Sequence, residues 1–278
     1  MSTNDLGTRT HAQRRAAALE VFEGFTNGEL DAERAQRSMT QRLGALGTFA
    51  FDVVMGDVWS RPELSRRDRS LIVIASLAAT GSVEELSLHT EIGLNHGLTR
   101  TEIEEIMLHV AAYAGFPTAR AAQQVVDDRF RTLDGVDRLP ERSSAAELDD
   151  SERERRGVEV RQSLTGGRSS GDPAADMAGL VGLLGGVGRI AYRWVFGDLW
   201  SRDELSRRDR SIVVISILTV LGCTDELAFH VPAALNHGLS RTEIEEIMVQ
   251  MTIYGGIPRA GEGFQAMKRA FDTVDSRG

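Results

Sequence analysis

The chain has 278 residues, a formal net charge of −9 and a single cysteine, Cys223. This length suits two domains of about 140 residues, and the acidic balance without a basic stripe argues against a nucleic-acid partner. One cysteine excludes an intrachain disulfide, and neither a signal peptide nor an apolar run of roughly 20 residues is present, so we expect a cytoplasmic protein without a membrane partner.

The sequence contains one pattern twice. The string GDVWSRPELSRRDRS begins at Gly56, and GDLWSRDELSRRDRS begins at Gly197, 141 positions later. The same shift relates HGLTRTEIEEIM, from His96, to HGLSRTEIEEIM, from His237. A duplication that keeps its register over this length predicts two tandem copies of one domain. Because each copy imitates one subunit of an oligomer, we expect the copies to pack on each other as a pseudo-dimer through apolar helices.

The polar stretch between the copies predicts a linker. Residues 131–156 are highly charged and offer few side chains that could fill a core. We therefore divide the chain into copy one at 1–135, a charged linker with room for some helix at 136–154, and copy two at 155–278. A Gly- and Ser-rich stretch at 163–173 predicts a flexible loop near the start of copy two.

Each copy is predicted to be helical, because no stretch shows convincing strand alternation. Ser65 is an N-cap candidate before the apolar run LIVIASLAAT, which Gly81 closes, so a long buried helix is expected there. A second helix follows at about 83–95 and ends at Gly97, a left-handed C-cap. The capping box at 99–102 opens a third helix, a proline ends it, and an alanine-rich segment forms one more. The predicted fold class is therefore all-α.

The second of these helices carries the main cluster of reactive side chains. Ser82, Glu85 and His89 follow one another at spacings of three and four, which places them on one helix face. A carboxylate one turn before an imidazole can orient it and raise its pKa, which suits proton transfer near neutral pH. We therefore predict catalytic pairs of Glu85 with His89 and, in copy two, of Glu226 with His230.

Structural roles compete with this prediction. Ser82 and Glu85 form a capping-box pattern by themselves, and a histidine on a half-buried helix is commonly a core residue. Copy two favours function, because Glu226 persists beside Cys223, a poor N-cap, and His230 recurs. The histidines at the ends of these helices are interpreted instead as partners of the helix dipole. They are His96 and His237.

Two arginines open the long buried helix of each copy. Arg66 and Arg67 run against the helix dipole, so either a salt bridge with Glu63 or Asp68 or an anionic substrate should compensate them. For the substrate alternative, we predict that these arginines and the serine one turn later bind the ligand in both copies. The predicted substrate-binding residues are Arg66, Arg67, Ser70, Arg207, Arg208 and Ser211. A metal site needs at least three convergent ligands and each copy offers two, so no metal is predicted.

Four motifs occur in both copies. They are W-S-R-x-E-L-S-R-R-D-R-S, G-x-x-(D/E)-E-L-x-x-H, N-H-G-L-(T/S)-R-x-E-I-x-E and Y-(A/G)-G-x-P-x-A. Together they resemble the carboxymuconolactone decarboxylase family. The resemblance implies an all-α fold, assembly into homo-oligomers (here a dimer or a trimer of pseudo-dimers) and sites near subunit contacts. It also implies a cofactor-independent carboxy-lyase that acts on an anionic small molecule, a carboxylated unsaturated lactone like 4-carboxymuconolactone, in aromatic-compound catabolism.

The same superfamily includes alkyl hydroperoxidase-like proteins built on C-x-x-C-x-x-x-H. Those cysteine positions fall on Ser82 and Glu85 in copy one, and on Cys223 and Glu226 in copy two. Without a second cysteine no thiol can resolve a sulfenate, so a dithiol peroxidase is not expected.

Two departures from the family pattern keep other functions open. A tandem of two such domains is less usual than a single domain, and copy one has Glu91 where copy two has Pro232. The added charge could reshape a pocket. The alternatives are a redirected enzyme that opens, closes or isomerises a lactone in secondary metabolism, and a non-catalytic scaffold that binds a ligand.

Overall fold

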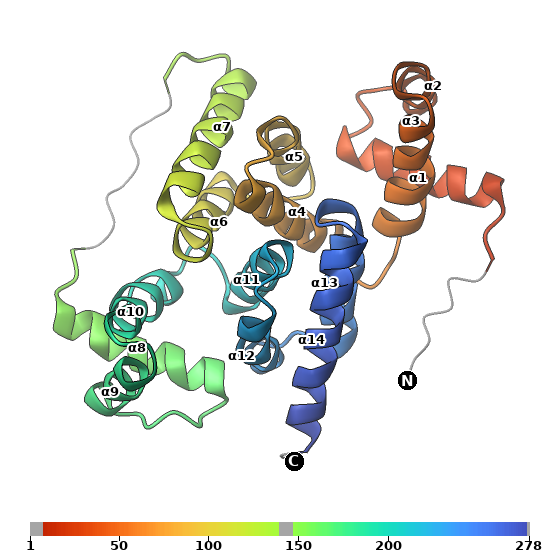
Figure 1. Cartoon of the computed structure of the whole chain (residues 1–278). Coiled ribbons are helices and arrows are strands. Elements are labelled where there is room, and N and C mark those ends of the chain that lie inside the picture. The colour runs from red at the N-terminus through yellow and green to blue at the C-terminus, as the bar shows by residue number, and fades with distance from the viewer. Residues whose placement is uncertain (1–7, 139–146, 277–278) are drawn as a thin grey trace.

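The computed structural model describes residues 8–138 and 147–276, and every regular element in these ranges is helical (Figure 1). The predicted all-α class is confirmed. Copy one contains α1 (His11–Phe25), α2 (Ala32–Leu43), α3 (Ala45–Phe49), the π-helical η1 (Ala50–Trp59), α4 (Arg66–Thr80), α5 (Val83–Asn95), α6 (Arg100–Tyr113) and α7 (Phe116–Asp134). Copy two contains α8 (Asp150–Thr165), α9 (Pro173–Leu184), α10 (Gly186–Ile190), the π-helical η2 (Ala191–Phe196), the short 3₁₀-helix η3 (Leu199–Ser201), α11 (Arg207–Leu221), α12 (Thr224–Asn236), α13 (Arg241–Tyr254) and α14 (Ile257–Asp275).

The helix α8 begins inside the stretch predicted as a linker. Asp149 is its N-cap and accepts a hydrogen bond from the backbone of Glu152, so the last residues of 136–154 are helical. Residues 139–146 of that predicted linker lie outside the described residues. The predicted loop at 163–173 starts later than expected, because α8 continues to Thr165. In the described part of the chain, no helix combines the length and the apolar character needed to cross a membrane.

Local sequence rules account for the long central helices α4 and α11. The Ser65 side chain accepts a hydrogen bond from the backbone of Asp68, and Ser206 caps α11 in the same way. Gly81 and Gly222 close these helices in the left-handed conformation, with φ of 71° and 75°. Between cap and glycine nearly every side chain is buried, which explains the unbroken apolar runs.

The capping boxes that were predicted for the third helix of each copy are present. Thr99 accepts from the backbone of Glu102, whose carboxylate in turn accepts from the backbone of Thr99, and Ser240 begins the equivalent box in α13. The capping box considered at Ser82 is not formed. The Ser82 hydroxyl makes no cap bond and lies 3.0 Å from the hydroxyl of Thr80.

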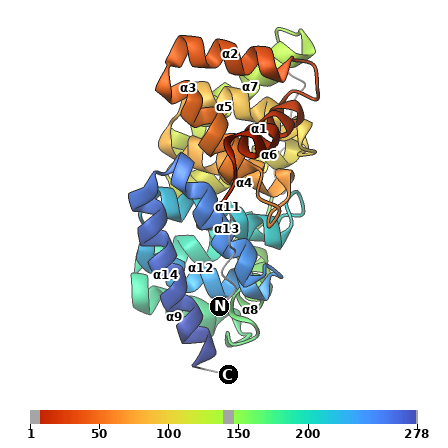
Figure 2. The ribbon, with the colours of Figure 1, turned by 90° about the vertical axis from the view of Figure 1, so that its right-hand side faces the viewer.

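The two halves pack on each other through α4 and α11, as expected for a pseudo-dimer. These helices lie side by side at the centre, and Figure 2 shows the helices of copy one stacked above those of copy two. The helix α13 of copy two also contacts α4, and α6 of copy one contacts α11. Each half therefore places its third long helix against the central helix of the other half.

Buried ion pairs cross this interface. Arg69 of α4 donates to Glu246 of α13 at 2.8 Å, and Arg61 donates to the same carboxylate at 2.7 Å. The second half repeats the arrangement with Arg210 and Glu105, which are 2.7 Å apart. The side chains of Arg69 and Arg210 are completely buried. A buried charge is tolerated only when it is paired, so these contacts fix the relative position of the halves.

Removing one partner should reveal the dependence on this pairing. We expect Glu246→Ala to lower the free energy of unfolding by about 3–5 kcal/mol, because it removes the carboxylate that pairs with buried Arg69 and leaves Arg61 only its longer contact with Glu63, at 3.8 Å. Glu245→Ala, at the exposed neighbouring position, is the matched control and should change stability little. Urea unfolding followed by circular dichroism measures both variants. Equal stabilities of the two variants would contradict the conclusion that these buried ion pairs hold the two halves together.

Candidate active site

Each half carries an aromatic cluster that a tyrosine from the other half completes. In copy one, Trp59 ends η1 and His89 lies on α5, while Tyr254 is the last residue of α13 in copy two. The indole Nε1 of Trp59 donates to the Tyr254 hydroxyl at 2.9 Å, and that hydroxyl lies 3.4 Å from Nε2 of His89. The rings of Trp59 and His89 are stacked, with centroids 6.0 Å apart. The site is therefore assembled from both copies.

The pseudo-twofold relation produces a second cluster. Trp200 Nε1 donates to the Tyr113 hydroxyl at 3.1 Å, and Tyr113 is the last residue of α6 in copy one. The Tyr113 ring meets the His230 ring edge to face at 5.6 Å, and Trp200 stacks on His230. Both clusters thus contain a tryptophan and a histidine from one half and a tyrosine from the other.

A second imidazole in each cluster is held by a serine from the central helix. Nδ1 of His96 lies 2.8 Å from the Ser70 hydroxyl, and Nδ1 of His237 lies 2.8 Å from the Ser211 hydroxyl. The His96 ring is 5.7 Å from the Trp59 ring, and the equivalent rings in copy two have the same separation. The histidines that end α5 and α12 therefore lie in the clusters as well as at the helix C-termini.

The hydrogen bonds of the first cluster relate the tyrosine proton to the tautomer of His89. An indole N–H can only donate, so the Tyr254 oxygen accepts from Trp59. When the Tyr254 proton is directed at Nε2 of His89, the proton of the neutral imidazole lies on Nδ1. Nδ1 is buried, and within the described residues it has no hydrogen-bond partner. In this tautomer Nδ1 can donate a hydrogen bond to a ligand oxygen.

Burial keeps all four imidazoles neutral. It is the largest cause that lowers the pKa of His89 and of His230 to about 3, and the neighbouring histidine adds to the effect. Burial likewise lowers the pKa of His96 and of His237 to about 4, with a further contribution from the nearby positive charge of Arg66 or Arg207. Burial also raises the pKa of both tyrosines. At neutral pH these groups are uncharged donors and acceptors.

The arginines at the start of α4 and α11 divide into two kinds. Arg67 bonds to Glu102 and, across the interface at 2.9 Å, to Asp209, while Arg208 bonds to Asp68 at 2.9 Å in the reverse direction. These two are compensated by salt bridges to acidic residues of both halves. The partners of Arg67 are Glu102 and Asp209 and not the expected Glu63 or Asp68. Their counterparts one position earlier are partly exposed and pair with the first helix of their own half: Arg66 with Glu20, and Arg207 with Glu159.

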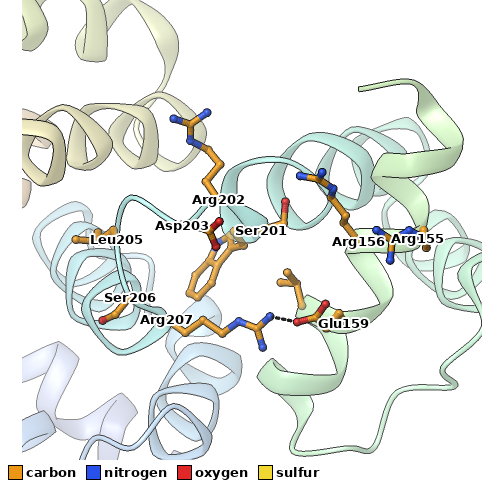
Figure 3. Close-up of a pocket in the computed structure, with 11 residues that line it drawn as sticks. Arg155, Arg156, Glu159, Ser201, Arg202, Asp203, Leu205, Ser206 and Arg207 are labelled. Carbon is orange, nitrogen blue, oxygen red and sulfur yellow. Dashed lines mark hydrogen bonds and ion pairs between the residues drawn. The ribbon is translucent and has the colours of Figure 1, made fainter. Parts of the chain in front are cut away.

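A cavity of about 420 Å³ opens between α8 and the start of α11 in copy two (Figure 3). Trp200 lines it and also stacks on His230, so one tryptophan joins the cavity to the aromatic cluster. Four arginines line the wall, and each also pairs with a carboxylate: Arg155 and Arg156 with Glu152, Arg202 with Glu105 and Glu204, and Arg207 with Glu159. The lining residues are Arg155, Arg156, Glu159, Val160, Trp200, Ser201, Arg202, Asp203, Leu205, Ser206 and Arg207. This environment suits a small anion.

Sequence comparison identifies the family to which these clusters belong. The sequence pattern described as "Carboxymuconolactone decarboxylase family" matches residues 45–128 and again 187–269. The chain belongs to this family. It carries the family's domain twice, in tandem.

Individual relatives match about one copy each. The chain is 36% identical over 121 residues to a 4-carboxymuconolactone decarboxylase of Acinetobacter baylyi, covering 44% of this chain and 90% of that protein. It is 41% identical over 133 residues to a nitrosuccinic acid decarboxylase of Metarhizium robertsii, covering 48% of this chain and 92% of that protein. An uncharacterized 15.0 kDa protein of Paracoccus denitrificans is 32% identical over 83 residues, 29% of this chain and 57% of that protein.

The predicted pairing of glutamate with histidine is not present in this family member. Glu85 and Glu226 are exposed in the first turns of α5 and α12, and neither makes a hydrogen bond to an imidazole in the described structure. The expected rise in the pKa of His89 and His230 is also wrong, because burial dominates and lowers it. A spacing of four residues places two side chains on one face, but here the histidine points inward and the longer carboxylate reaches solvent.

Of the other residues that the sequence analysis singled out, some lie in the clusters and some do not. Ser70 and Ser211 lie within the clusters, where they contact His96 and His237, the histidines for which the sequence predicts a role at the helix dipole. The carboxylate of Glu91 pairs with Arg129 of α7 in its own half. Cys223 is partly buried, and burial raises the pKa of its thiol. In the ranges that the structure describes, no three His, Cys, Asp or Glu residues converge as a metal site.

Sequence reasoning missed both tryptophans, both tyrosines and the second histidines. Their recurrence in W-S-R, Y-(A/G)-G and N-H-G in both copies was the available signal. The sequence did not indicate that the tyrosine of one copy meets the tryptophan of the other, because that contact depends on how α6 and α13 cross the interface.

The buried neutral histidines predict a stability that falls on acidification. Their folded pKa values lie below the ordinary value of 6.5, so between pH 6.5 and about 4 the unfolded chain binds more protons than the folded chain. Stability should be complete above pH 6.5 and decline as the pH falls. Urea unfolding at pH 7.5, 6.5 and 5.5 measures the slope. We expect a smaller slope for His89→Gln/His230→Gln and an unchanged slope for His11→Gln, whose side chain is exposed.

Proposed function

We propose that the chain is a cofactor-independent carboxy-lyase that decarboxylates a carboxylated unsaturated lactone of the 4-carboxymuconolactone kind. The observation that carries this proposal is the cross-half cluster of neutral Trp, Tyr and His groups beside an arginine-lined cavity. Two relatives that each match about one copy are named as decarboxylases of small organic acids, 4-carboxymuconolactone and nitrosuccinic acid. The proposal takes from them the reaction type, and the site residues follow from the geometry.

The reaction requires three contributions from the protein. When the bond to the departing carboxylate breaks, carbon dioxide leaves and the electron pair moves through the ring to the lactone carbonyl oxygen. The protein must bind the carboxylates, stabilise the developing oxyanion and deliver a proton to carbon. The substrate carbonyl accepts the electron pair, so no organic cofactor is needed.

We assign carboxylate binding to the partly exposed arginines Arg207 and Arg66, because Arg67 and Arg208 are occupied by the interface. Arg207 lines the cavity and lies close enough to His237 to lower the pKa of that imidazole. A guanidinium group binds a carboxylate through paired hydrogen bonds. The carboxylate would therefore sit within reach of the imidazoles.

The neutral imidazoles are assigned to the oxyanion and the proton. An N–H such as that on Nδ1 of His89 can donate to the developing oxyanion in a site with little water, where such a bond is strong. The tyrosine hydroxyl, held by the tryptophan, can pass a proton to Nε2 as the imidazole gives its other proton to carbon, and water then returns a proton to the tyrosine oxygen. In this scheme the tyrosine takes the role that the sequence had assigned to Glu85 and Glu226.

The alternatives to a lyase differ in what they require and in what they release. A dithiol peroxidase needs two thiols, and the sequence has only Cys223. A redirected lactone enzyme would use the same donors without releasing carbon dioxide, and a scaffold would bind without turnover. Carbon dioxide release therefore separates the lyase from the other functions, and consumption of the substrate without carbon dioxide release separates the redirected enzyme from the scaffold.

Exposed apolar side chains support the proposal that the protein is a homo-oligomer. Leu46 and Phe49 of copy one are 64% and 47% exposed, and the equivalent Val187 and Ile190 of copy two are 69% and 59% exposed. Both halves thus present an apolar surface at the same turn, near α3 and α10. Surfaces of this kind commonly mark subunit contacts.

Loss of the central histidines should abolish decarboxylation. We expect His89→Gln and His230→Gln each to lower kcat/KM at one site, and the double variant to lose about 10²- to 10⁴-fold of the total activity. Carbon dioxide release from 4-carboxymuconolactone, and separately from nitrosuccinic acid, is the measurement. His11→Gln is the control. Full activity of the double variant, on a substrate that the wild type converts, would refute the assignment.

The tyrosines should act across the halves. We expect His89→Gln/Tyr254→Phe to retain the activity of His89→Gln alone, because both changes fall on one cluster. His89→Gln/Tyr113→Phe should lose activity at both clusters. Each double variant removes one histidine and one tyrosine, so the two are matched in composition. If instead the Tyr254 variant were the weaker enzyme, each tyrosine would serve its own copy and the cross-half site would be wrong.

A further inference from the structure

We propose that the two halves are functionally unequal, and that only the second half binds both carboxylates of a dicarboxylic acid, through Arg207 on one side of its cavity and Arg155 and Arg156 on the other. This inference rests on the proposed function for the acidic nature of the ligand. It adds the residues that recognise the second carboxylate and limits that recognition to one site per chain.

The first helices of the two halves, α1 and α8, do not follow the 141-residue shift that relates the rest of the two copies. Arg14 of α1 bonds to Asp57 at 2.8 Å, and Arg153 of α8 makes the same bond to Asp198 at 3.1 Å. The two aspartates are 141 positions apart, whereas the two arginines are 139 apart. In space, therefore, each residue of α8 corresponds to the residue of α1 that lies 139 positions earlier.

This shift reveals a difference in charge between the halves. At a constant shift of 141, Arg155 and Arg156 would correspond to another Arg-Arg pair and the halves would look alike. In the structural register they correspond to Ala16 and Ala17. The second cavity therefore has two guanidinium groups on a wall where the first half has two methyl groups.

The arginines of the second cavity retain unused donors. Arg155 donates through Nε and Nη2 to Glu152, both at 2.8 Å, and Arg156 donates through Nε to the same carboxylate at 2.8 Å. Arg207 donates through Nη2 to Glu159 at 2.8 Å. A guanidinium group has five N–H donors, so each retains several that no described residue accepts. Figure 3 shows Arg207 extending from α11 toward α8, which carries Arg155 and Arg156. Donors on two walls of one cavity match two carboxylates on one molecule.

The halves also differ beside the second histidine. In copy one Arg66 lies against Gly24, where any side chain would overlap its guanidinium group, and it also donates to the backbone oxygen of Glu20. In copy two the equivalent of Gly24 is Ser163, whose hydroxyl lies 3.1 Å from Nε2 of His237. The serine fills the space that Arg66 uses in copy one, so the arginine of the second half cannot pack there.

The binding of succinate, measured by isothermal titration calorimetry on the full chain at fixed salt and pH 7.5, tests this inference. Succinate has two carboxylates but neither a lactone nor a nitro group to accept electrons, so binding is measured without turnover. We expect one succinate per chain, and at least tenfold weaker binding by Arg155→Ala/Arg156→Ala, the loss expected for one charge-assisted hydrogen bond. Butyrate, with four carbons and one carboxylate, should bind at least tenfold more weakly than succinate.

The control variant is Arg168→Ala/Arg189→Ala, which removes two exposed arginines of the same half that do not line the cavity. It should bind succinate within about twofold of the wild type. The test variant carries at both positions the residues found in the first half, and thermal melting by circular dichroism checks that it is folded.

Three results would overturn the inference: undiminished succinate binding by Arg155→Ala/Arg156→Ala, two equivalent succinates per chain, or no succinate bound at millimolar concentration. These results are distinct from a failure of the proposed function. Arginine-dependent succinate binding by a chain that releases no carbon dioxide from either acid would leave this inference standing and refute the decarboxylase. Decarboxylation by a chain whose succinate binding does not depend on Arg155 and Arg156 would support the proposed function and overturn this inference.

Discussion

The buried ion pairs between the halves are the constraint on which the rest of the structure depends. Glu246 of α13 lies against Arg69 of α4, and Tyr254 follows two helical turns later on the same helix. Because a helix is rigid over two turns, fixing the glutamate also fixes the tyrosine, which then meets Trp59 of the opposite half. The same reasoning applies to α6 and the second cluster. Charge pairing in the interface thus decides which residues meet in the candidate sites.

Burial determines the chemistry of these sites more than neighbouring charge does. The histidines lie among aromatic rings and under the central helices, so the protein disfavours their charged form and their pKa falls. A neutral imidazole cannot serve as a strong acid at neutral pH, but it can donate one hydrogen bond while accepting another. The cationic groups stand at the edge of the site, on Arg66 and Arg207. This separation suits a reaction in which an anion binds at the rim and negative charge develops on an oxygen further inside.

Several local predictions from the sequence were confirmed because they depend on neighbouring residues only. The caps at Ser65 and Ser206 and the left-handed glycines are properties of short segments, and the all-α class is the sum of such segments. The tandem duplication is read directly from the repeated sequence. The predicted Glu85–His89 pair failed because helix periodicity shows which side chains share a face but not how deeply each is buried. His96 was assigned to the helix end, which is correct as far as the helix is concerned. Its contact with Ser70 comes from the packing of α5 on α4.

The sequence by itself determined the family, the helical architecture and the residue types available for chemistry. Only the tertiary structure decided how they combine, because the decisive contacts join segments far apart in the chain. It brought Tyr113 to Trp200, turned Arg67 and Arg208 into interface residues and left Arg207 at the cavity. It also showed that α8 lies two positions out of the 141-residue register, because the chain from Leu164 to Asp172, the N-cap of α9, is two residues longer than the chain from Phe25 to Asp31, the N-cap of α2. The contacts of α1 and α8 with the rest of each half locate this difference, because they show which residues of the two helices occupy equivalent positions.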